Sequence, residues 1–376
     1  MRDLLFVQST TEMGGAESVL VNLLSASEEL KARSTVATLG FGDRSLSARL
    51  RAEGADVVEL RGARLRDLPG AVGTIRRLAR LARERGARVL LGNGAHPQVF
   101  AAAAAWLARA KSVYLVHMIH RVPLCANGAI DALAAASPFT LAISNSKATL
   151  EAMRKLRPRA RHAVVHPGVP QVAVDPDDAR RARRELGAGD GEVLFGVFGR
   201  LQRWKGQDVF VEAAARVARE IPAARFAVVG GSVFGLEPEF TRALVARAGA
   251  LGLGGRIVFA GHRRDVPRLM AACDVVCHTT RVPEPFGIVV IEAMAQARPV
   301  VATRGGGPSE IIEEGQTGLL VSPDDAEALA DAARTLGCDP ALRARMGAQG
   351  RERVRERFTS ERAAAALVSA LDEVAR

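Results

Sequence analysis

The sequence predicts an α/β protein with two doubly wound parallel-sheet domains. Short apolar runs alternate with helical stretches along the whole chain, which is typical of parallel strands covered by helices on both faces. The 376 residues also exceed the size at which a single hydrophobic core stops growing. A segment punctuated by prolines, residues 164–186, interrupts the alternation. We therefore place a linker there, between a first domain of residues 1–168 and a second of residues 169–358.

Five apolar runs in the first half are predicted to be strands. They comprise residues 4–9, 34–39, 55–60, 87–92 and 112–117. Helices are expected from about Ala16, near Ser45 and over the Arg-rich stretch 71–88. The last of these is amphipathic, because its apolar residues recur on one face and its arginines lie on the others. The apolar face is expected to consist of Val72, Ile75, Leu78 and Ala82.

The second half repeats the alternation more plainly. Its predicted strands comprise residues 192–200, 224–231, 256–262, 273–280, 298–307 and 317–322. The linker ends in DPDD (175–178), which we interpret as an aspartate cap on the next helix and not as a metal motif. Residues 357–376 are predicted to form an amphipathic helix of about five turns with a Ser or Thr cap. From the pattern alone, this helix could belong to either domain.

Composition indicates a soluble globular protein, with 48% hydrophobic and 25% charged residues. The most apolar stretches, such as residues 99–108, are shorter than the roughly 20 residues of a membrane-spanning helix. The N-terminal run ends in turn residues without a cleavage site, so we interpret it as a first strand and not a signal peptide. A cytoplasmic protein is expected.

The four cysteines are expected to be free thiols, since four in a chain this long do not make a disulfide framework. They are Cys125, Cys273, Cys277 and Cys338. Two of them lie with His278 in ACDVVCHTT (272–280), which could suggest zinc ligands. A strand would point Cys277 and His278 to opposite faces, and no second ligand pair lies nearby. We therefore favour a core strand.

The positive charge is confined to the first half of the chain. Residues 1–170 contain 24 Lys and Arg against 13 Asp and Glu, whereas residues 171–376 contain 28 of each, so the net +11 lies entirely in the first part. A basic face would suit an anionic partner such as acidic lipid headgroups, a phosphorylated substrate or nucleic acid. A solvated surface in an Arg-rich protein is the alternative.

Two turns in the second half are candidate anion sites, because ligands of parallel sheets bind where strands end and helices begin. GRLQRWKGQD (199–208) brings Arg200 and Lys205 to a helix N-terminus, where two cations could bind a diphosphate. TRGGGPSE (303–310) carries Gly306 and Gly307 within three consecutive glycines, which would let the backbone approach a ligand closely. GGSVFG (230–235) is a third Gly-rich turn.

Two carboxylates in EPFGIVVIEAMA (284–295) raise the question of why a charge lies within a buried helical pattern. Helical side chains lean toward the N-terminus, so Glu292 would point back to the turn that holds Glu284. Both could then accept hydrogen bonds from ribose or sugar hydroxyls at the same edge of the sheet. The alternative is that Glu292 reaches solvent and Glu284 caps the helix.

The first half offers a Gly-Gly turn and two histidines. Gly14 and Gly15 follow the first predicted strand and could admit a phosphate or a substrate to a helix N-terminus. The turn lacks three spaced glycines, which argues against a nicotinamide or flavin cofactor. His117 ends a strand at the same kind of edge and His120 follows in the loop. A lone histidine is more often structural than catalytic.

These motifs resemble those of the glycosyltransferases of family 4, retaining enzymes built from two facing Rossmann-like domains with an interdomain cleft, the GT-B architecture. EPFGIVVIEAMA is similar to the family's pair of glutamates separated by seven residues. GRLQRWKG (199–206), VATRGGGPSEIIEEGQTGLLV (301–321) and the early Gly-Gly turn follow the family's order. The resemblance covers nearly the whole chain and is strongest over residues 193–330.

The resemblance implies a role for each candidate residue in binding a nucleoside diphosphate sugar. Arg200 and Lys205 would neutralise the leaving diphosphate, Glu292 would hold the ribose and Glu284 would contact hydroxyls of the donor sugar. The remaining contacts would come from the glycine turns, a strand end and the backbone beside Glu284. They are Gly14, Gly15, His117, Phe286, Gly287, Gly306 and Gly307.

The resemblance implies no metal and no other cofactor, because two cations and a helix dipole would stabilise the leaving group. The first domain, joined by a last helix of residues 359–376, would bind a lipid-linked, saccharide or small-molecule acceptor. Transfer would retain configuration, and no nucleic acid is expected as a partner. The basic charge of the first domain, and not the resemblance, suggests that a cytoplasmic enzyme could also lie on the cytoplasmic face of a membrane. Donor base, donor sugar and acceptor stay open.

Two departures from the family pattern bear on these roles. HPGV from His166 replaces the commoner Asn-Gly-Val of the linker, and Met-Ile-His follows His117, so either His117 or His120 could approach the sugar.

A nucleotide-sugar epimerase of the same fold is an alternative function. A nucleic-acid binder is a second alternative, which the 4% aromatic content disfavours because base stacking needs aromatic residues.

Overall fold

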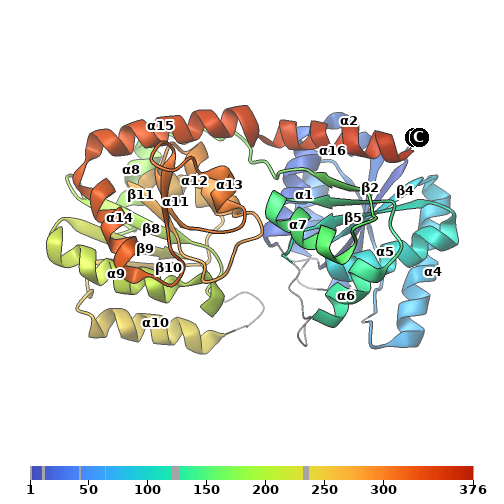
Figure 1. Cartoon of the computed structure of the whole chain (residues 1–376), viewed down its shortest axis with the longest axis horizontal. Coiled ribbons are helices and arrows are strands. Elements are labelled where there is room, and N and C mark those ends of the chain that lie inside the picture. The colour runs from blue at the N-terminus through green and yellow to red at the C-terminus, as the bar shows by residue number, and fades with distance from the viewer. Residues whose placement is uncertain are drawn as a thin grey trace. The chain divides into compact units, whose positions relative to one another are not determined.

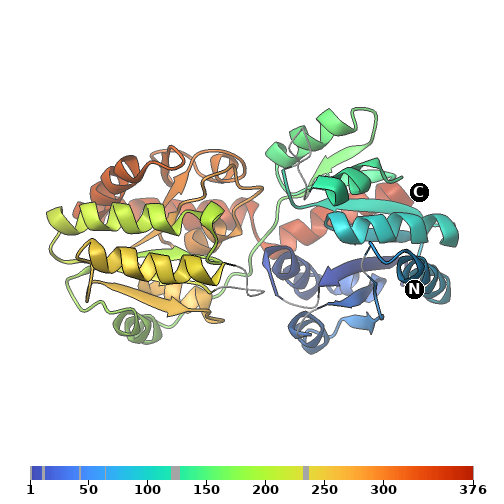
Figure 2. The same cartoon turned by 90° about the horizontal axis from the view of Figure 1, so that it is seen from below.

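The computed structural model describes residues 2–10, 13–41, 44–63, 65–119, 128–231 and 237–375. The chain forms two compact units. Unit 1 comprises residues 1–170 and 358–376, and unit 2 comprises residues 171–357. Each unit is a parallel sheet with helices on both faces (Figures 1 and 2), which confirms the predicted fold class.

Unit 1 contains a seven-stranded sheet in the order β3-β2-β1-β4-β5-β6-β7. All its strand pairs are parallel, and the order reverses between β1 and β4. The strands are β1 (Leu4–Thr10), β2 (Ser34–Phe41), β3 (Asp56–Glu59), β4 (Val89–Asn93), β5 (Lys111–Val116), β6 (Leu141–Ser144) and β7 (His162–Val164). The point of reversal is where ligands of doubly wound sheets typically bind.

Helices cover both faces of this sheet, and alternate residues of β1 face opposite layers. Leu4 and Phe6 lie in a core with α1 and α16, while Leu5 and Val7 pack with α4 and α5. The helices of unit 1 are α1 (Gly15–Ala26), α2 (Glu28–Arg33), α3 (Ser45–Ala52), α4 (Leu68–Arg85), α5 (Ala95–Ala108), α6 (Gly128–Ala136), α7 (Lys147–Leu156) and α16 (Ser360–Ala375).

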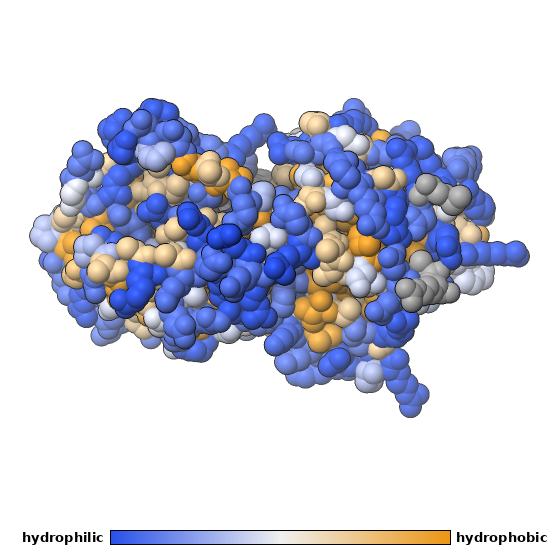
Figure 3. All heavy atoms as spheres, turned by 90° about the horizontal axis from the view of Figure 1, so that it is seen from above, coloured by the Kyte–Doolittle hydropathy of each residue, from blue (hydrophilic) through white to orange (hydrophobic). Residues whose placement is uncertain are grey.

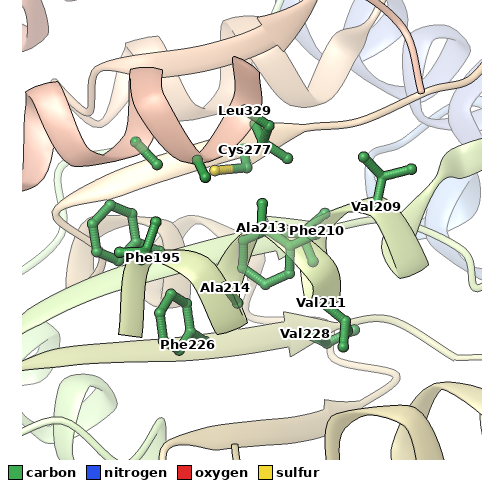
Figure 4. Packing of buried hydrophobic residues seen from close by; sticks show 14 of the residues in the cluster. Phe195, Val209, Phe210, Val211, Ala213, Ala214, Phe226, Val228, Cys277 and Leu329 are labelled. Carbon is green, nitrogen blue, oxygen red and sulfur yellow. The ribbon is translucent and has the colours of Figure 1, made fainter. Parts of the chain in front are cut away.

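Unit 2 contains a six-stranded parallel sheet in the order β10-β9-β8-β11-β12-β13, which reverses between β8 and β11. Figure 4 shows its core, where Phe195 and Phe226 stack with ring centroids 5.6 Å apart and pack with residues of α9 (Gln207–Glu220). The strands are β8 (Val193–Phe198), β9 (Ala224–Val229), β10 (Ile257–Gly261), β11 (Val275–His278), β12 (Val300–Thr303) and β13 (Gly318–Val321).

The helices of unit 2 follow the strands in the expected alternation. They are α8 (Pro176–Glu185), a 3-10 turn (Arg203–Lys205), α9 (Gln207–Glu220), α10 (Pro238–Ala250), α11 (Val266–Ala272), α12 (Ile288–Ala295), α13 (Pro308–Ile311), α14 (Ala326–Cys338) and α15 (Pro340–Arg357). Asp175 caps α8 by accepting hydrogen bonds from the backbone N–H groups of Asp177 and Asp178, so the interpretation of DPDD as a cap is confirmed.

The eleven predicted strands are present, and two further strands were not predicted. These are β6 and β7, which have only four and three residues and therefore give little periodicity. The buried face of α4 agrees with the prediction in part. Leu78 and Ala82 are buried as predicted, whereas Val72 is 46% exposed, and Ala71 and Thr74 are buried instead.

Three of the four cysteines, Cys273, Cys277 and Cys338, are free thiols as predicted, and Cys125 lies outside the described residues. Cys277 belongs to β11 and packs in the core of unit 2, which confirms the core-strand interpretation. Burial raises the pKa of its thiol well above the ordinary value, so the thiolate that a metal requires is disfavoured there.

The surface in Figure 3 is mostly hydrophilic, with hydrophobic side chains in small scattered groups. Over the part of the chain that the structure describes, we find no helix both long and apolar enough to cross a membrane.

Candidate functional site

The candidate site of unit 2 lies at the carboxyl ends of β8 and β11, where the strand order reverses. Two loops leave these strands and are joined by hydrogen bonds. The hydroxyl of Thr279 donates to the carbonyl of Lys205 over 2.9 Å, and the N–H of Arg281 donates to the carbonyl of Trp204 over 2.9 Å. The loop after β8 is therefore held against the loop after β11.

Gly206 is required at this junction for two reasons. Its φ of 68° is in the left-handed region, and a Cβ there would lie 2.0 Å from the carbonyl oxygen of Thr279. It ends the 3-10 turn that holds Lys205 and precedes α9, whose N-terminus has no side-chain cap. The N-terminal N–H groups of α9 are thus available beside Lys205.

Lys205 and Glu284 form an ion pair across the two loops. Nζ of Lys205 lies 2.7 Å from Oε2 of Glu284, and the side chains are 18% and 12% exposed. The ammonium also lies over the ring of Trp204, 4.1 Å from its centroid. Burial acts to raise the pKa of Glu284, but Lys205 and His278 outweigh it and lower the pKa to about 2. Glu284 is therefore a carboxylate at neutral pH.

His278 is a third member of this cluster, and the sequence interpretation missed its part in it. It is the last residue of β11, is 5% exposed, and holds Nε2 3.5 Å from Oε2 of Glu284. Within the described residues, neither ring nitrogen has a hydrogen-bond partner. The available indication was its position, because a polar residue that ends a buried strand lies at the ligand-binding edge of the sheet.

The glycine turn after β12 holds the backbone of Glu284 in place. The N–H of Gly307 donates to the carbonyl of Glu284 over 2.9 Å, and Gly306 pairs with Glu284 as a parallel bridge. A Cβ on Gly306 would lie 2.0 Å from that carbonyl, and one on Gly307 would lie 2.1 Å from the carbonyl of Phe286. Two of the three glycines therefore let two loops pack closely, a role that the sequence alone does not distinguish from contact with a ligand.

Phe286 and Gly287 connect this loop to α12. The ring of Phe286 is buried, and Gly287 has a φ of 90° as the residue that precedes the helix. Glu292 lies in the second turn of α12 and is partly exposed. Burial raises its pKa to about 7. No hydrogen bond or ion pair joins it to Lys205, Glu284 or any other described residue.

Arg200 lies in the loop after β8 and is partly exposed. Its carbonyl accepts a hydrogen bond of 2.8 Å from the side chain of Gln207, which fixes its backbone beside the start of α9. Its guanidinium forms no ion pair with the residues that the structure describes. The structure thus brings together Lys205, Glu284 and the glycine turn, while the side chains of Arg200 and Glu292 have no bonded partner in the cluster.

The candidate site of unit 1 lies at the equivalent reversal, between β1 and β4. His117 follows β5, and its Nε2 lies 2.6 Å from Oδ1 of Asn93, the last residue of β4. Nδ2 of Asn93 donates to Oε1 of Gln8 on β1 over 2.7 Å, and Nε2 of Gln8 donates to Oε1 of Glu17 over 2.6 Å. Burial lowers the pKa of His117 to about 4, so its ring is neutral at neutral pH.

The Gly-Gly turn starts α1 beside this site, with Gly14 before the helix and Gly15 as its first residue. A Cβ on Gly14 would lie 2.6 Å from Oε2 of Glu17, whereas a Cβ on Gly15 would meet no atom within 4 Å. Gly14 therefore leaves room for a carboxylate of the chain itself. His120 and residues 232–235 of the third Gly-rich turn lie outside the described residues.

Two family models match the chain. The model described as Glycosyltransferase Family 4 matches residues 13–171, and the model described as Glycosyl transferases group 1 matches residues 178–353. The two matches together span most of both units.

Curated relatives include the D-inositol 3-phosphate glycosyltransferase of Nocardia farcinica, which is 34% identical over 264 residues, 64% of this chain and 58% of that protein. The lipopolysaccharide core biosynthesis mannosyltransferase LpsB of Rhizobium meliloti is 33% identical over 203 residues, 54% of this chain and 57% of that protein. The chain thus spans less than two thirds of the length of these relatives.

Among solved structures, HepE of Anabaena in complex with UDP and glucose is similar over 99% of this chain and 100% of that chain, with 28% identity and a TM-score of 0.88. A glycosyltransferase of Rickettsia africae is similar over 99% of this chain and 98% of that chain, with 19% identity and a TM-score of 0.82. At that identity, the second likeness shows the fold alone.

Proposed function

Since the chain belongs to the glycosyltransferases of family 4, we propose that it is an enzyme that transfers a sugar from a nucleoside diphosphate sugar to an acceptor used in cell-envelope or glycoconjugate synthesis. The observation that carries the proposal is the cluster of Lys205, Glu284 and His278 at the reversal of the unit 2 sheet. The cation there can bind a diphosphate, and the carboxylate can accept hydrogen bonds from sugar hydroxyls.

The diphosphate would be bound by Lys205, Arg200 and the N-terminus of α9. Only Gly206 separates Lys205 from the uncapped start of this helix, and Arg200 has no competing side-chain partner among the described residues. Two positive side chains and a helix N-terminus can stabilise the charge that develops on a leaving diphosphate without a metal ion. We therefore propose metal-independent transfer, and, on the family resemblance, retention of configuration.

The donor's hydroxyl groups would be bound by the two glutamates. Glu284 is a carboxylate held in place by Lys205 and by the backbone at Gly306 and Gly307, which suits it to accept hydrogen bonds from sugar hydroxyls beside Phe286 and Gly287. Glu292 has no partner of its own, so ribose hydroxyls could satisfy it. In unit 1, the contacts with the donor would come from Gly14, Gly15 and His117.

A UDP-linked sugar is the donor to test first. HepE, which is similar over nearly the whole length of both chains, was solved in complex with UDP and with UDP-glucose. A relative of Mycolicibacterium smegmatis that is 34% identical over 195 residues, 49% of this chain and 49% of that protein, is named as GDP-mannose-dependent. A panel of donors must therefore include both bases.

The acceptor would be lipid-linked or otherwise presented at an anionic membrane surface. Trp106 at the end of α5 is 76% exposed and Leu107 is 41% exposed. Arg83 of α4 donates from its guanidinium to the carbonyl of Leu107 over 3.1 Å, which brings a cation to the same place. Aromatic and apolar side chains next to arginine suit the interface of an anionic membrane.

The test is thermal stabilisation of the purified chain by UDP, GDP, ADP, TDP and their sugars, first in chelator and then with magnesium. A ligand that binds only the folded state at 100 times its Kd stabilises by about 2.7 kcal/mol, which gives a clear shift in Tm. A shift with one base in chelator is the expected result. No shift with any nucleotide, for folded protein, would contradict the proposal.

A further inference from the structure

A continuous chain of hydrogen bonds crosses the reversal of the unit 1 sheet, from Glu17 through Gln8 and Asn93 to His117. Its three heavy-atom distances are 2.6, 2.7 and 2.6 Å. Gln8 and Asn93 are 1% and 5% exposed, so water can hardly replace a partner that is lost. We name these four residues the His117 relay.

The direction of every bond in the relay follows from its first member. A carboxylate only accepts hydrogen bonds, so the amide end of Gln8 that faces Glu17 must be the NH₂ group. The carbonyl of Gln8 then faces Asn93 and must accept a hydrogen bond from the NH₂ group of Asn93. The carbonyl of Asn93 in turn faces Nε2 of His117 and must accept a hydrogen bond from an N–H at that nitrogen. Any other orientation sets two acceptors or two donors against each other in a buried place.

We propose that Glu17, Gln8 and Asn93 are positioning residues that hold His117 in the neutral tautomer with the proton on Nε2. Nδ1 is then the nitrogen with the free lone pair. A low pKa caused by burial agrees with a ring that stays neutral at neutral pH. The tautomer of His117 is thus decided by the carboxylate of Glu17, which is three hydrogen bonds away. Its immediate neighbour, Asn93, could not decide it alone, because an amide can turn either way.

The relay also gives Gly14 a specific purpose. Glu17 is in the first turn of α1, where a carboxylate is favoured by the helix dipole. Its Oε2 occupies the space in which a Cβ of Gly14 would lie, 2.6 Å away. A side chain at position 14 would therefore require the carboxylate of Glu17 to move from the place in which it accepts from Gln8.

The consequence for transfer rests on the proposed function. If His117 contacts the donor sugar, it does so through Nδ1 as an acceptor, and so it favours a sugar that presents a hydroxyl hydrogen at that point. A cavity of about 30 Å³ lies beside the ring, and its lining is mostly apolar with four polar residues, Asn93, His117, Asn145 and His166. The ring therefore borders a pocket and is not enclosed by packed side chains on every side.

The direct test is the ¹⁵N spectrum of the histidine rings in the full chain, recorded above neutral pH and assigned with a His117→Asn variant. The wild-type ring is expected to show a single tautomer with the proton on Nε2. Glu17→Gln removes the acceptor-only end, so both amides can reverse and a mixture of tautomers is expected. Glu29→Gln, the same change in the first turn of α2, is the matched control and should leave the ring unchanged.

A rescue separates the relay from a merely structural role. In Glu17→Gln/Asn93→Asp, the new carboxylate accepts from both His117 and Gln8, and Gln8 in turn accepts from the amide at position 17. This double variant should return the ring to the single Nε2–H tautomer. Asn93→Asp alone places Gln8 between two carboxylates, at positions 17 and 93, so one of its polar groups loses its hydrogen bond. The Tm of this single variant should therefore be lower than that of the double variant.

Two results would overturn the inference: a proton on Nδ1 of His117 in the wild type, or a His117 tautomer in Glu17→Gln that is identical to wild type. The first result needs no variant, so the test holds even if a variant fails to fold. Donor binding is measured separately on the same samples. If His117 carries its proton on Nε2 but no nucleotide binds, the proposed function is contradicted and the relay is supported. If nucleotide binds but the proton is on Nδ1, the relay is contradicted and the proposed function is supported.

Discussion

Nζ of Lys205 and Oε2 of Glu284 are bonded to each other at 2.7 Å, although the family resemblance assigns one to the diphosphate and the other to the sugar. A diphosphate bound as proposed would have to share Lys205 with Glu284 or draw it away. In either case the charge of Glu284 would be coupled to the charge of the donor, and the two residues would act together.

Lys205→Met is expected to weaken nucleotide binding and to destabilise the chain. Loss of one charged hydrogen bond, worth about 1.5–3 kcal/mol, raises the Kd for the nucleotide by roughly 10- to 100-fold. The variant also leaves Glu284 partly buried without its cation, which costs about 3 kcal/mol or more of the free energy of unfolding. Urea unfolding measures the second effect. Lys205→Met/Glu284→Gln should recover much of the stability but not the binding, and equal instability of both variants would argue against the pair.

Glu284→Gln is expected to make the stability less sensitive to acid. The folded pKa of about 2 lies below the ordinary 4.5, so the wild-type carboxylate stabilises the fold above pH 4.5 and loses this contribution as the pH falls toward 2. The contribution is roughly 3 kcal/mol. Free energies of unfolding measured across this range should fall less steeply in the variant. Turnover should decrease more than nucleotide affinity, and unchanged turnover would remove Glu284 from the site.

Glu292→Gln is expected to have the opposite effect on stability. The folded pKa of about 7 lies above 4.5, so the folded chain retains a proton that the unfolded chain releases, and wild-type stability falls as the pH rises from about 4.5 to 7. The neutral amide should remove this loss and stabilise the chain by about 1–3 kcal/mol above neutral pH, because the group is partly exposed. Nucleotide binding, measured by titration calorimetry, should weaken. Tight binding in a stabilised variant would contradict a ribose contact.

Gly306→Ala should lower turnover far more than Gly315→Ala. The two glycines have φ values of 68° and 76°, so alanine strains the backbone similarly at both positions, by about 1 kcal/mol. Only at Gly306 would the new Cβ collide with a neighbour, since it lies 2.0 Å from the carbonyl of Glu284, whereas no atom lies within 4 Å at Gly315. Kinetics and Tm of both variants, compared side by side, separate displacement of Glu284 from backbone strain. Equal losses of turnover would show that strain alone matters.

Trp106→Ala is expected to reduce binding to anionic vesicles without changing the fold. The side chain is 76% exposed, so its removal should alter the free energy of unfolding by no more than about 0.5 kcal/mol. Loss of a tryptophan that enters the membrane interface should weaken partition by about tenfold or more. Co-sedimentation with phosphatidylglycerol and phosphatidylcholine vesicles measures this. Leu133→Ala, at another exposed apolar position in unit 1, is the control, and equal effects of both changes would indicate nonspecific adsorption.

The sequence predicted that Lys205 and Glu284 lie close together because both belong to loops that follow strands, and the carboxyl ends of parallel strands share one edge. The pairing of Lys205 with Glu284 was less accessible, since 79 residues separate them and two loops must first pack together. The part of His278 was missed because the predicted strand extends to Thr280, which places His278 inside the strand, whereas β11 ends at His278.

The His117 relay could not be predicted from local patterns. It depends on the register of β1 against β4, in which Val7 pairs with Gly92, so that the next residues along, Gln8 and Asn93, come together. A single-residue shift would turn one of these amides to the other face of the sheet. Similarly, the buried face of α4 is set by its packing on α5, and the smaller Ala71 is buried where the sequence pattern favoured Val72.

The return of residues 358–376 to unit 1 has a consequence for synthesis of the chain on the ribosome. Ala364, Leu367, Leu371 and Val374 of α16 belong to the same core as Leu4 and Phe6 of β1. Unit 2 is continuous in sequence, so it can complete its core while these last residues are still inside the ribosomal exit tunnel. Residues 1–170 are synthesised before residues 358–376, so one apolar face of the unit 1 sheet stays uncovered until α16 emerges. Nascent unit 1 is therefore expected to bind chaperones, and to aggregate when translation stops before α16 is made.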